Sequence, residues 1–180
     1  MAEPVDESRL TAMVTAFLPH VWRFLRRLGV PAADVDDAVQ EVILVAAKKL
    51  DRIEVGSERA FLLSTAFHVA RRMRCVRAKR GEVTDDTLTD VANPAPAPDA
   101  ALDEKQSRAL LDAILLRMPV DLRTVFVLFE IEELTVATIA TMLDIPIGTA
   151  ASRLRRARED FESRVARLES RARFNEGADR

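Results

Sequence analysis

The sequence predicts an all-α protein made of two small helical domains that a flexible acidic linker joins. Five Gly, no Tyr and many Ala, Leu, Arg and Glu among 180 residues favour helices. Apolar residues recur at helical spacing along most of the chain, and one Pro- and Ala-rich stretch interrupts them. We therefore expect a first domain at 1–80, a linker at 81–103, a second domain at 104–172 and a frayed tail at 173–180.

The composition also narrows the location and the class of protein. Cys75 is the only cysteine, so an internal disulfide is excluded and a reducing compartment is favoured. The chain begins with an acidic rather than a basic segment, and no uncharged run approaches the length of a membrane span. We expect a cytoplasmic protein without membrane insertion.

The first helix is expected to run from Ser8 toward Leu18, with apolar residues at helical spacing. Pro19 either kinks this helix or opens a second segment, which ends at Gly29. We expect Trp22, within that segment, to be a core residue with a structural role.

The next helix is expected from Asp34, which can cap it, to about Leu50. One face of this helix is apolar, and another is acidic with a leucine in it. The apolar face comprises Val35, Val39, Val42 and Ala46, and the acidic face comprises Asp37, Gln40, Glu41, Leu44 and Lys48. The acidic face fits either a solvated surface or a docking surface for a basic partner helix, and periodicity does not decide between them.

A third helix is expected to begin at Ser57 and Glu58 and to end near Arg80. Its buried stripe comprises Leu62, Ala66, Val69, Met73 and Val76. Residues 61–80 contain six Lys or Arg and no acid, whereas residues 81–104 contain seven acids and no Lys or Arg. The helix dipole accounts for part of this basic charge, and the excess suggests a nearby phosphate backbone.

The stretch Leu134–Arg158 is expected to form two helices separated by a turn. Thr135 opens the first helix, whose apolar side carries Ile139, Ala140 and Leu143. Asp144-Ile145-Pro146 breaks this helix, and the second helix starts near Gly148-Thr149. Earlier helices, at Glu104–Arg117 and after Pro119, are expected to support the pair.

The second helix of this pair has a narrow apolar stripe and a cationic opposite face. The stripe comprises Ala150, Leu154 and Ala157, and the opposite face comprises Thr149, Ser152, Arg153, Arg155, Arg156 and Arg158. Such a helix occurs as the solvated side of a helical bundle or as a helix that enters a DNA groove. Four Arg against one Asp in residues 135–158 favour the DNA interpretation.

These residues resemble the C-terminal domain of bacterial extracytoplasmic-function sigma factors. The similarity follows Met118-Pro119-x-x-x-Arg123-x-Val125-Phe126-x-Leu128, then Glu132-x-Leu134-Thr135 and Ile139-Ala140, then Ile145-Pro146-x-Gly148-Thr149-x-x-Ser152-Arg153-Leu154-x-Arg156-Ala157-Arg158. Upstream, Asp34-x-x-Asp37-x-x-Gln40-Glu41-Val42 is similar to the segment of these proteins that binds the clamp helices of the polymerase β′ subunit. Phe61-Leu62 and Thr65-Ala66 resemble pairs in the helix that helps to open the minus-ten element.

The resemblance implies a sigma factor, which directs promoter-specific initiation by core RNA polymerase through the β′ clamp helices and the β flap. It assigns polymerase binding to Asp37, Gln40, Glu41 and Leu44, and minus-ten contacts to His68, Arg71 and Arg72. It assigns minus-thirty-five contacts to Thr149, Ser152, Arg155 and Arg156, with Arg153 at a phosphate. Expected partners are therefore the polymerase, promoter DNA and an anti-sigma protein.

Several positions depart from the family pattern. His68 stands where the family usually has Asn, and Arg72 stands where it usually has Asp, so the base read at the minus-ten element does not carry over. Ala151 replaces a residue that is basic in many relatives. Ile43, Val45 and Ala47 occupy positions that are often Phe, Arg and Trp, which leaves the acidic motif intact but changes its flanks.

Residues that could perform catalysis are sparse. Two isolated His, one Cys and no Gly-rich phosphate loop predict no catalytic residue, no metal and no cofactor, and the acids of the 34–44 segment lack a second segment to hold Mg²⁺ with them.

Two other functions fit parts of the chain: an autonomous helix-turn-helix regulator that binds an operator as a dimer, and an adaptor that binds another protein. The regulator explains residues 135–158 but gives no reason for the acidic face at Asp37–Glu41.

Overall fold

The computed structural model describes the backbone of residues 5–81 and 100–178 and the side chains of residues 8–81 and 106–170. Within these ranges the secondary structure is helical and contains no strand, so the predicted all-α fold is confirmed. The chain forms two compact units, Met1–Thr87 and Leu88–Arg180. Most of the predicted acidic linker lies outside the described residues.

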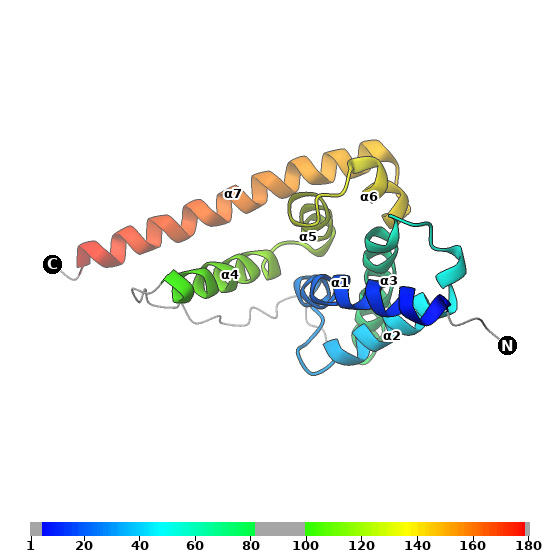
Figure 1. Cartoon of the computed structure of the whole chain (residues 1–180). Helices are drawn as coiled ribbons and strands as arrows, with labels where there is room; N and C mark the ends of the chain where they lie inside the picture. Colours follow the sequence, from blue (N-terminus) through cyan, green and yellow to red (C-terminus); the bar gives the residue numbers. More distant parts are fainter. Residues whose placement is uncertain (1–4, 82–99, 179–180) are drawn as a thin grey trace. The chain divides into compact units, whose positions relative to one another are not determined.

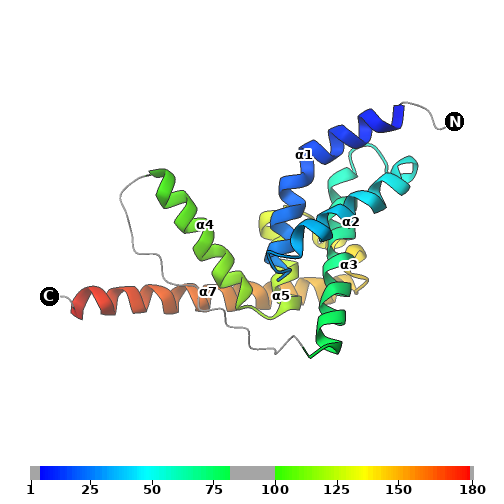
Figure 2. The same cartoon turned by 90° about the horizontal axis from the view of Figure 1, so that it is seen from below.

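The N-terminal unit is a bundle of three helices, seen from two sides in Figures 1 and 2. These are α1 (Val5–Arg27), α2 (Val35–Lys48) and α3 (Glu58–Lys79), with a 3-10 turn, η1 (Leu50–Arg52), after α2. Each helix packs against the other two. The completely buried core includes Phe24, Leu25, Leu28, Val42 and Leu63.

Helix α1 continues through Pro19 as a single helix that bends along its length (Figure 2). Proline removes the hydrogen bond to the carbonyl of Thr15, but both residues are exposed, so water can satisfy that carbonyl. The structure thus has the kinked helix and not a second segment.

The prediction that Trp22 is a core residue is wrong, because its side chain is 40% exposed and its Nε1 donates to Asp36 Oδ1 at 3.2 Å.

The apolar face predicted for α2 is buried, as expected, but its start differs from the prediction. Asp34 occupies the N-cap position without a side-chain cap hydrogen bond, and its carboxylate instead lies 3.9 Å from Arg77 Nη1 of α3. In α3 the buried residues end at Ala70. Val76 is therefore 42% exposed, which corrects the prediction that it belongs to the buried stripe.

Arg9 of α1 ties the loop before α3 to the rest of the N-terminal unit. Its guanidinium donates to the backbone carbonyls of Leu50 and Ile53 and to Glu58 Oε1, the last at 3.1 Å. The other carboxylate oxygen of Glu58 accepts the backbone N–H of Gly56 at 2.6 Å. Glu58 thus satisfies backbone and side-chain donors where the Ser57 side chain provides no cap.

The C-terminal unit places α5 (Val120–Phe126) and α6 (Val136–Leu143) against α7 (Ile147–Ala178). Helix α4 (Ala100–Leu116) precedes them, and a π-helical segment, η2 (Val127–Ile131), follows α5 directly. Helix α4 begins four residues before the predicted Glu104, and α7 extends into the predicted tail (Figure 1). Core residues include Leu115, Val125, Leu128 and Ile139.

Hydrogen bonds define both ends of α6, the helix that precedes the turn to α7. Thr135 Oγ1 accepts the backbone N–H of Thr138 at 3.1 Å, so the predicted cap at the start of α6 is confirmed. Asp144 ends α6 with φ 54° and ψ 52°, the left-handed conformation, and the Ile145 N–H donates to the Ala140 carbonyl at 3.0 Å. The chain therefore reverses within a few residues before α7 begins.

The left-handed backbone of Asp144 leads to a stability prediction. Asp144→Val should unfold at a lower urea concentration than Asp144→Gly, because a β-branched residue is strained at positive φ. The expected difference in the free energy of unfolding is about 1–2 kcal/mol. At the exposed helical position Ala151 the same comparison should reverse, with the Gly variant less stable by a few tenths of a kcal/mol. Far-UV circular dichroism checks both pairs, and the same order at the two positions would contradict the turn.

The contacts of Glu58 generate a pH prediction. The hydrogen bond from its own backbone N–H, followed by that from Arg9, holds the pKa of Glu58 below its ordinary value of 4.5. Because the folded-state pKa is the lower one, ionised Glu58 stabilises the fold above about pH 4.5. That stabilisation is lost as the pH falls through the folded-state value.

We therefore expect Glu58→Gln to lower the melting temperature of the N-terminal unit at pH 7 and to match the wild type in strong acid. Trp22, the only tryptophan, lies in this unit, so its fluorescence reports the transition. Glu54→Gln is the control, since Glu54 is exposed and its side chain forms no hydrogen bond or ion pair within the described ranges. A Glu58→Gln deficit that persisted in acid would show that the ionised carboxylate is not responsible.

Candidate functional site

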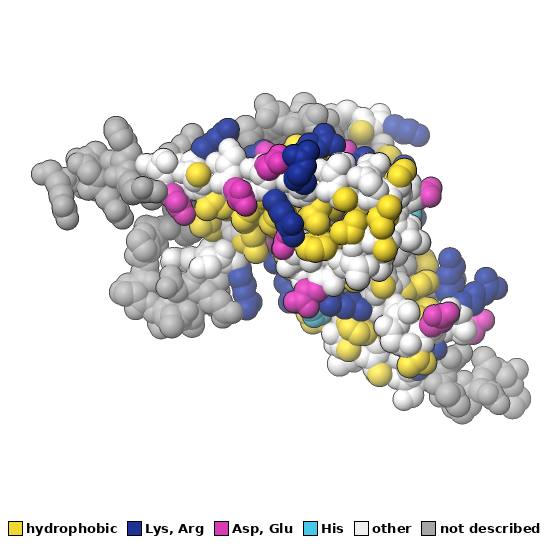
Figure 3. All heavy atoms as spheres, turned by 90° about the horizontal axis from the view of Figure 1, so that it is seen from above, with side chains coloured by type: hydrophobic (Ala, Val, Ile, Leu, Met, Phe, Trp, Pro, Cys, Tyr) yellow, Lys and Arg dark blue, Asp and Glu magenta, His cyan; other side chains and the backbone are white. Residues whose placement is uncertain are grey.

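Helix α7 packs by small residues and leaves its cationic side exposed. Ala150, Leu154 and Ala157 are buried against the unit's other helices, so the predicted apolar stripe is confirmed. Arg155 and Arg156 lie on the exposed side, with Thr149, Ser152 and Arg153 partly exposed beside them. Figure 3 shows groups of basic side chains, with acidic side chains between them, beside a continuous area of hydrophobic side chains.

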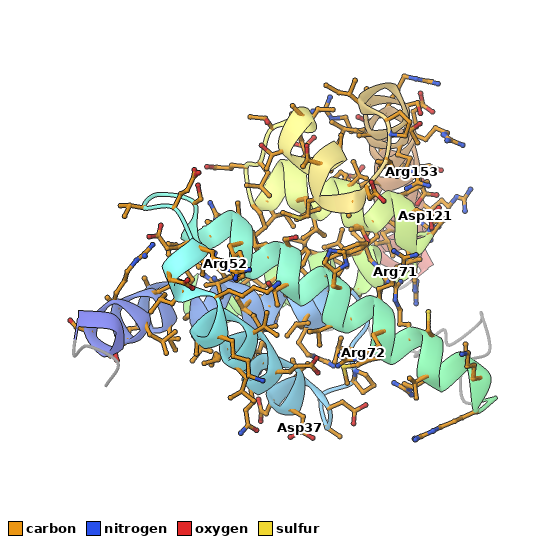
Figure 4. The ribbon with its side chains drawn as sticks, turned by 90° about the vertical axis from the view of Figure 1, so that its right-hand side faces the viewer. Asp37, Arg52, Arg71, Arg72, Asp121 and Arg153 are labelled. Atoms are coloured by element: carbon orange, nitrogen blue, oxygen red, sulfur yellow. The ribbon has the colours of Figure 1, made fainter. Side chains whose placement is uncertain are left out.

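The arginines of this side differ in their partners. Arg153 Nη2 lies 3.7 Å from Asp121 Oδ2 of α5, a pair labelled in Figure 4, and Arg155 donates to Glu159 Oε1 at 2.7 Å. Arg156 has no hydrogen-bond or ion-pair partner among the described side chains. It is thus the cation of this group that is most available to an external ligand.

Arg158 is held by the π-helical segment. Its Nε donates to Glu130 Oε1 at 2.6 Å, and its guanidinium lies 5.1 Å from the centroid of the Phe129 ring. The Glu132 N–H donates to the Val127 carbonyl at 2.9 Å, and this five-residue spacing is that of a π-helix. Arg158 therefore belongs to the scaffold that positions α7, and the sequence contained no periodic signal for its pairing with Glu130.

The acidic face of α2 is exposed as the docking interpretation requires. Asp37 and Gln40 point to solvent without a partner in the described part of the chain, and Leu44 is 53% exposed between them and the end of the helix. Figure 4 shows Asp37 on the outer side of α2. Trp22 and Asp36 border this face from α1 and from the first turn of α2, a pairing that the sequence interpretation missed.

The candidate minus-ten residues lie on the exposed side of α3. The His68 ring meets the half-buried Phe67 ring edge-on, with centroids 5.4 Å apart. Arg71 is exposed and has no hydrogen-bond or ion-pair partner among the described side chains, whereas Arg72 donates to the Glu41 carboxylate of α2. This hydrogen bond raises the pKa of Arg72 above its ordinary value.

The Arg72–Glu41 ion pair therefore joins two groups of residues that the sequence assigned to different partners. Figure 4 labels Arg72 on α3 and Asp37 on the neighbouring α2. The acid and the base lie 31 positions apart in the sequence, so helical spacing does not reveal their contact.

Neither a metal cluster nor a membrane span is found in the parts that the structure describes. No group of three or more His, Cys, Asp or Glu side chains there could hold a metal ion. No helix within the same ranges is long and apolar enough to cross a membrane.

Comparison with known proteins assigns both units to one family. The model for "Sigma-70 region 2" matches residues 13–80, and the model for "Sigma-70, region 4" matches residues 102–161. The chain is 26% identical over 172 residues to the ECF RNA polymerase sigma-E factor of Escherichia coli K12, covering 91% of this chain and 90% of the relative. It is 25% identical to the RNA polymerase sigma-H factor of Pseudomonas aeruginosa, covering 91% and 89% of the two chains.

Two solved structures share the fold. The sigma factor RpoE from Bartonella quintana, in complex with the anti-sigma factor NepR, matches with a TM-score of 0.67 and 22% identity over 85% of this chain and 94% of that one. CnrH, in complex with the cytosolic domain of CnrY, matches with a TM-score of 0.62 and 20% identity over 89% of each chain.

Together the two family matches span more than half of the chain, and they coincide with the α2–α3 face and the α6–α7 turn described above. The chain therefore belongs to the extracytoplasmic-function group of sigma factors, non-enzymatic proteins that bind core RNA polymerase and promoter DNA and act in the initiation of transcription.

Proposed function

We propose that this sigma factor recognises a minus-thirty-five element with the first half of α7 and helps to open a minus-ten element with α3, while α2 docks on core polymerase. The observation that carries the proposal is the exposed cationic side of α7, which lies opposite the buried Ala150, Leu154 and Ala157. A helix fixed by one side and basic on the other suits the major groove of DNA.

Within α7 the contacts of each arginine support different roles. Arg156 is unpaired among the described side chains, so it is the residue that we assign to a base, where a guanine offers two acceptors. Arg153 is more confined, with its side chain 27% exposed beside Asp121, and we assign it to a phosphate. Arg155 reaches DNA only by leaving Glu159, which costs little for an exposed pair. Thr149 and Ser152 supply short polar contacts at the start of the helix.

On α3 we assign His68, Arg71 and Arg72 to the minus-ten region. The exposed His68 ring can stack beneath an unpaired base or hydrogen-bond to it. Two arginines on the next turn supply charge for the phosphate backbone, which compensates the repulsion between strands as the duplex opens. The neighbouring core residues Ala66, Val69 and Ala70 hold this side of α3 outward.

On α2 we assign polymerase docking to Asp37, Gln40, Glu41 and Leu44. An exposed leucine among acidic and amide side chains suits a partner helix that is basic and partly apolar, and the β′ clamp helices are the partner that we propose. The C-terminal unit would contact the β flap. Because the similar RpoE was solved with the anti-sigma factor NepR, we also propose an anti-sigma partner for this chain.

Asp37→Arg tests the docking assignment. Asp37 is a better choice than Glu41, because a new arginine at position 41 would also face Arg72 within the unit itself. With core polymerase and a pool of randomised promoters, we expect the wild type to give specific run-off transcripts and Asp37→Arg to reduce them at least tenfold, through charge repulsion at the interface.

The matched control for this assay is Asp51→Arg, which makes the same change of charge at an exposed residue of η1, outside the α2 face. It should transcribe like the wild type. Equal activity of Asp37→Arg and Asp51→Arg would remove α2 from the docking surface, and transcripts independent of the sigma factor would contradict the proposed function as a whole.

Arg156→Ala tests base recognition by α7. We expect the free energy of promoter binding to become less favourable by about 1–3 kcal/mol. Binding should also become tolerant of substitution at a single base pair of the minus-thirty-five element. The control is Arg167→Ala, an exposed arginine on the same side of α7 three turns further along, which should not alter sequence preference. An equal loss on every promoter sequence would make Arg156 a phosphate contact instead.

A further inference from the structure

The Arg72–Glu41 ion pair connects the proposed docking surface with the proposed minus-ten surface. Glu41 belongs to the exposed side of α2, and Arg72 belongs to the exposed side of α3. The side chains are 58% exposed for Arg72 and 34% exposed for Glu41. A macromolecular partner can therefore reach both groups, although each already has a partner within the chain.

The pair weakens each proposed contact in the isolated protein. A basic helix of the polymerase would be attracted to Glu41, but Arg72 occupies that carboxylate and repels an approaching cation. A DNA phosphate would be attracted to Arg72, but Glu41 neutralises that charge. Arg71, the adjacent cation without a partner among the described side chains, has no such competitor.

We propose that Arg72 exchanges partners on assembly: a basic group of the polymerase takes over Glu41, and the released Arg72 contacts a DNA phosphate beside the minus-ten element. The inference rests on the proposed function and adds a coupling between its two surfaces. Polymerase and DNA both bind better when the ion pair between Arg72 and Glu41 is broken. Binding of either one therefore raises the affinity of the chain for the other.

Arg72→Met and Arg71→Met separate this exchange from a simple loss of charge. In a binding assay with full-length chain and core polymerase, Arg72→Met should bind roughly two- to fivefold more tightly than the wild type, because no exposed ion pair has to be broken. Arg71→Met should bind the polymerase like the wild type. Holoenzymes that contain either variant should bind promoter DNA more weakly than the wild-type holoenzyme. The dependence of their affinity on salt concentration should decrease by the amount expected for about one lost phosphate contact.

Equal or weaker polymerase binding by Arg72→Met would overturn the exchange, and so would tighter binding without any loss of promoter affinity. Arg72→Gln provides a second variant should Arg72→Met lose helical content by circular dichroism, and the same results are expected of it. If the wild type itself does not bind core polymerase, the proposed function fails before the variants are compared.

Discussion

The close packing of α7 by small side chains is the constraint on which the proposed DNA surface depends. Ala150, Leu154 and Ala157 are buried in α7, which packs against α5 and α6. A larger side chain at either alanine would displace the helix, because buried contacts tolerate little extra volume. The left-handed Asp144 then sets the direction in which α7 leaves the turn. One side of the helix is thereby fixed inward, and its arginines are fixed outward.

Local ion pairs arrange the basic residues of both units before any partner is present. Asp121 of α5 holds Arg153 of α7, Glu159 holds Arg155 within α7, and in the N-terminal unit Glu41 holds Arg72. Exposed pairs of this kind stabilise the fold by at most about 1 kcal/mol each, so a phosphate or a base can replace the acid at little cost. The pairs orient the side chains without preventing their use, and they leave Arg156 and Arg71 directly accessible within the described ranges.

Sequence periodicity was sufficient for elements whose burial follows from local spacing. It predicted the apolar face of α2, the cap at Thr135 and the stripe of α7, since each depends on residues within a few turns of one another. It did not predict the exposure of Trp22 or the π-helical segment after α5, which depend on how separate helices meet. The Arg72–Glu41 ion pair was not predicted for the same reason, although Arg72 was identified from the sequence as a departure from the family pattern.

Site-specific cross-linking from α7 tests the central claim most directly. The natural Cys75 would be replaced by Ser and Ala151 by Cys, which places one photoreactive group on an exposed position in the first turns of α7. In the promoter-bound holoenzyme, we expect cross-links to a few adjacent base pairs centred on the minus-thirty-five element. Cross-links confined to protein, or spread over DNA without a fixed distance from the start site, would contradict it.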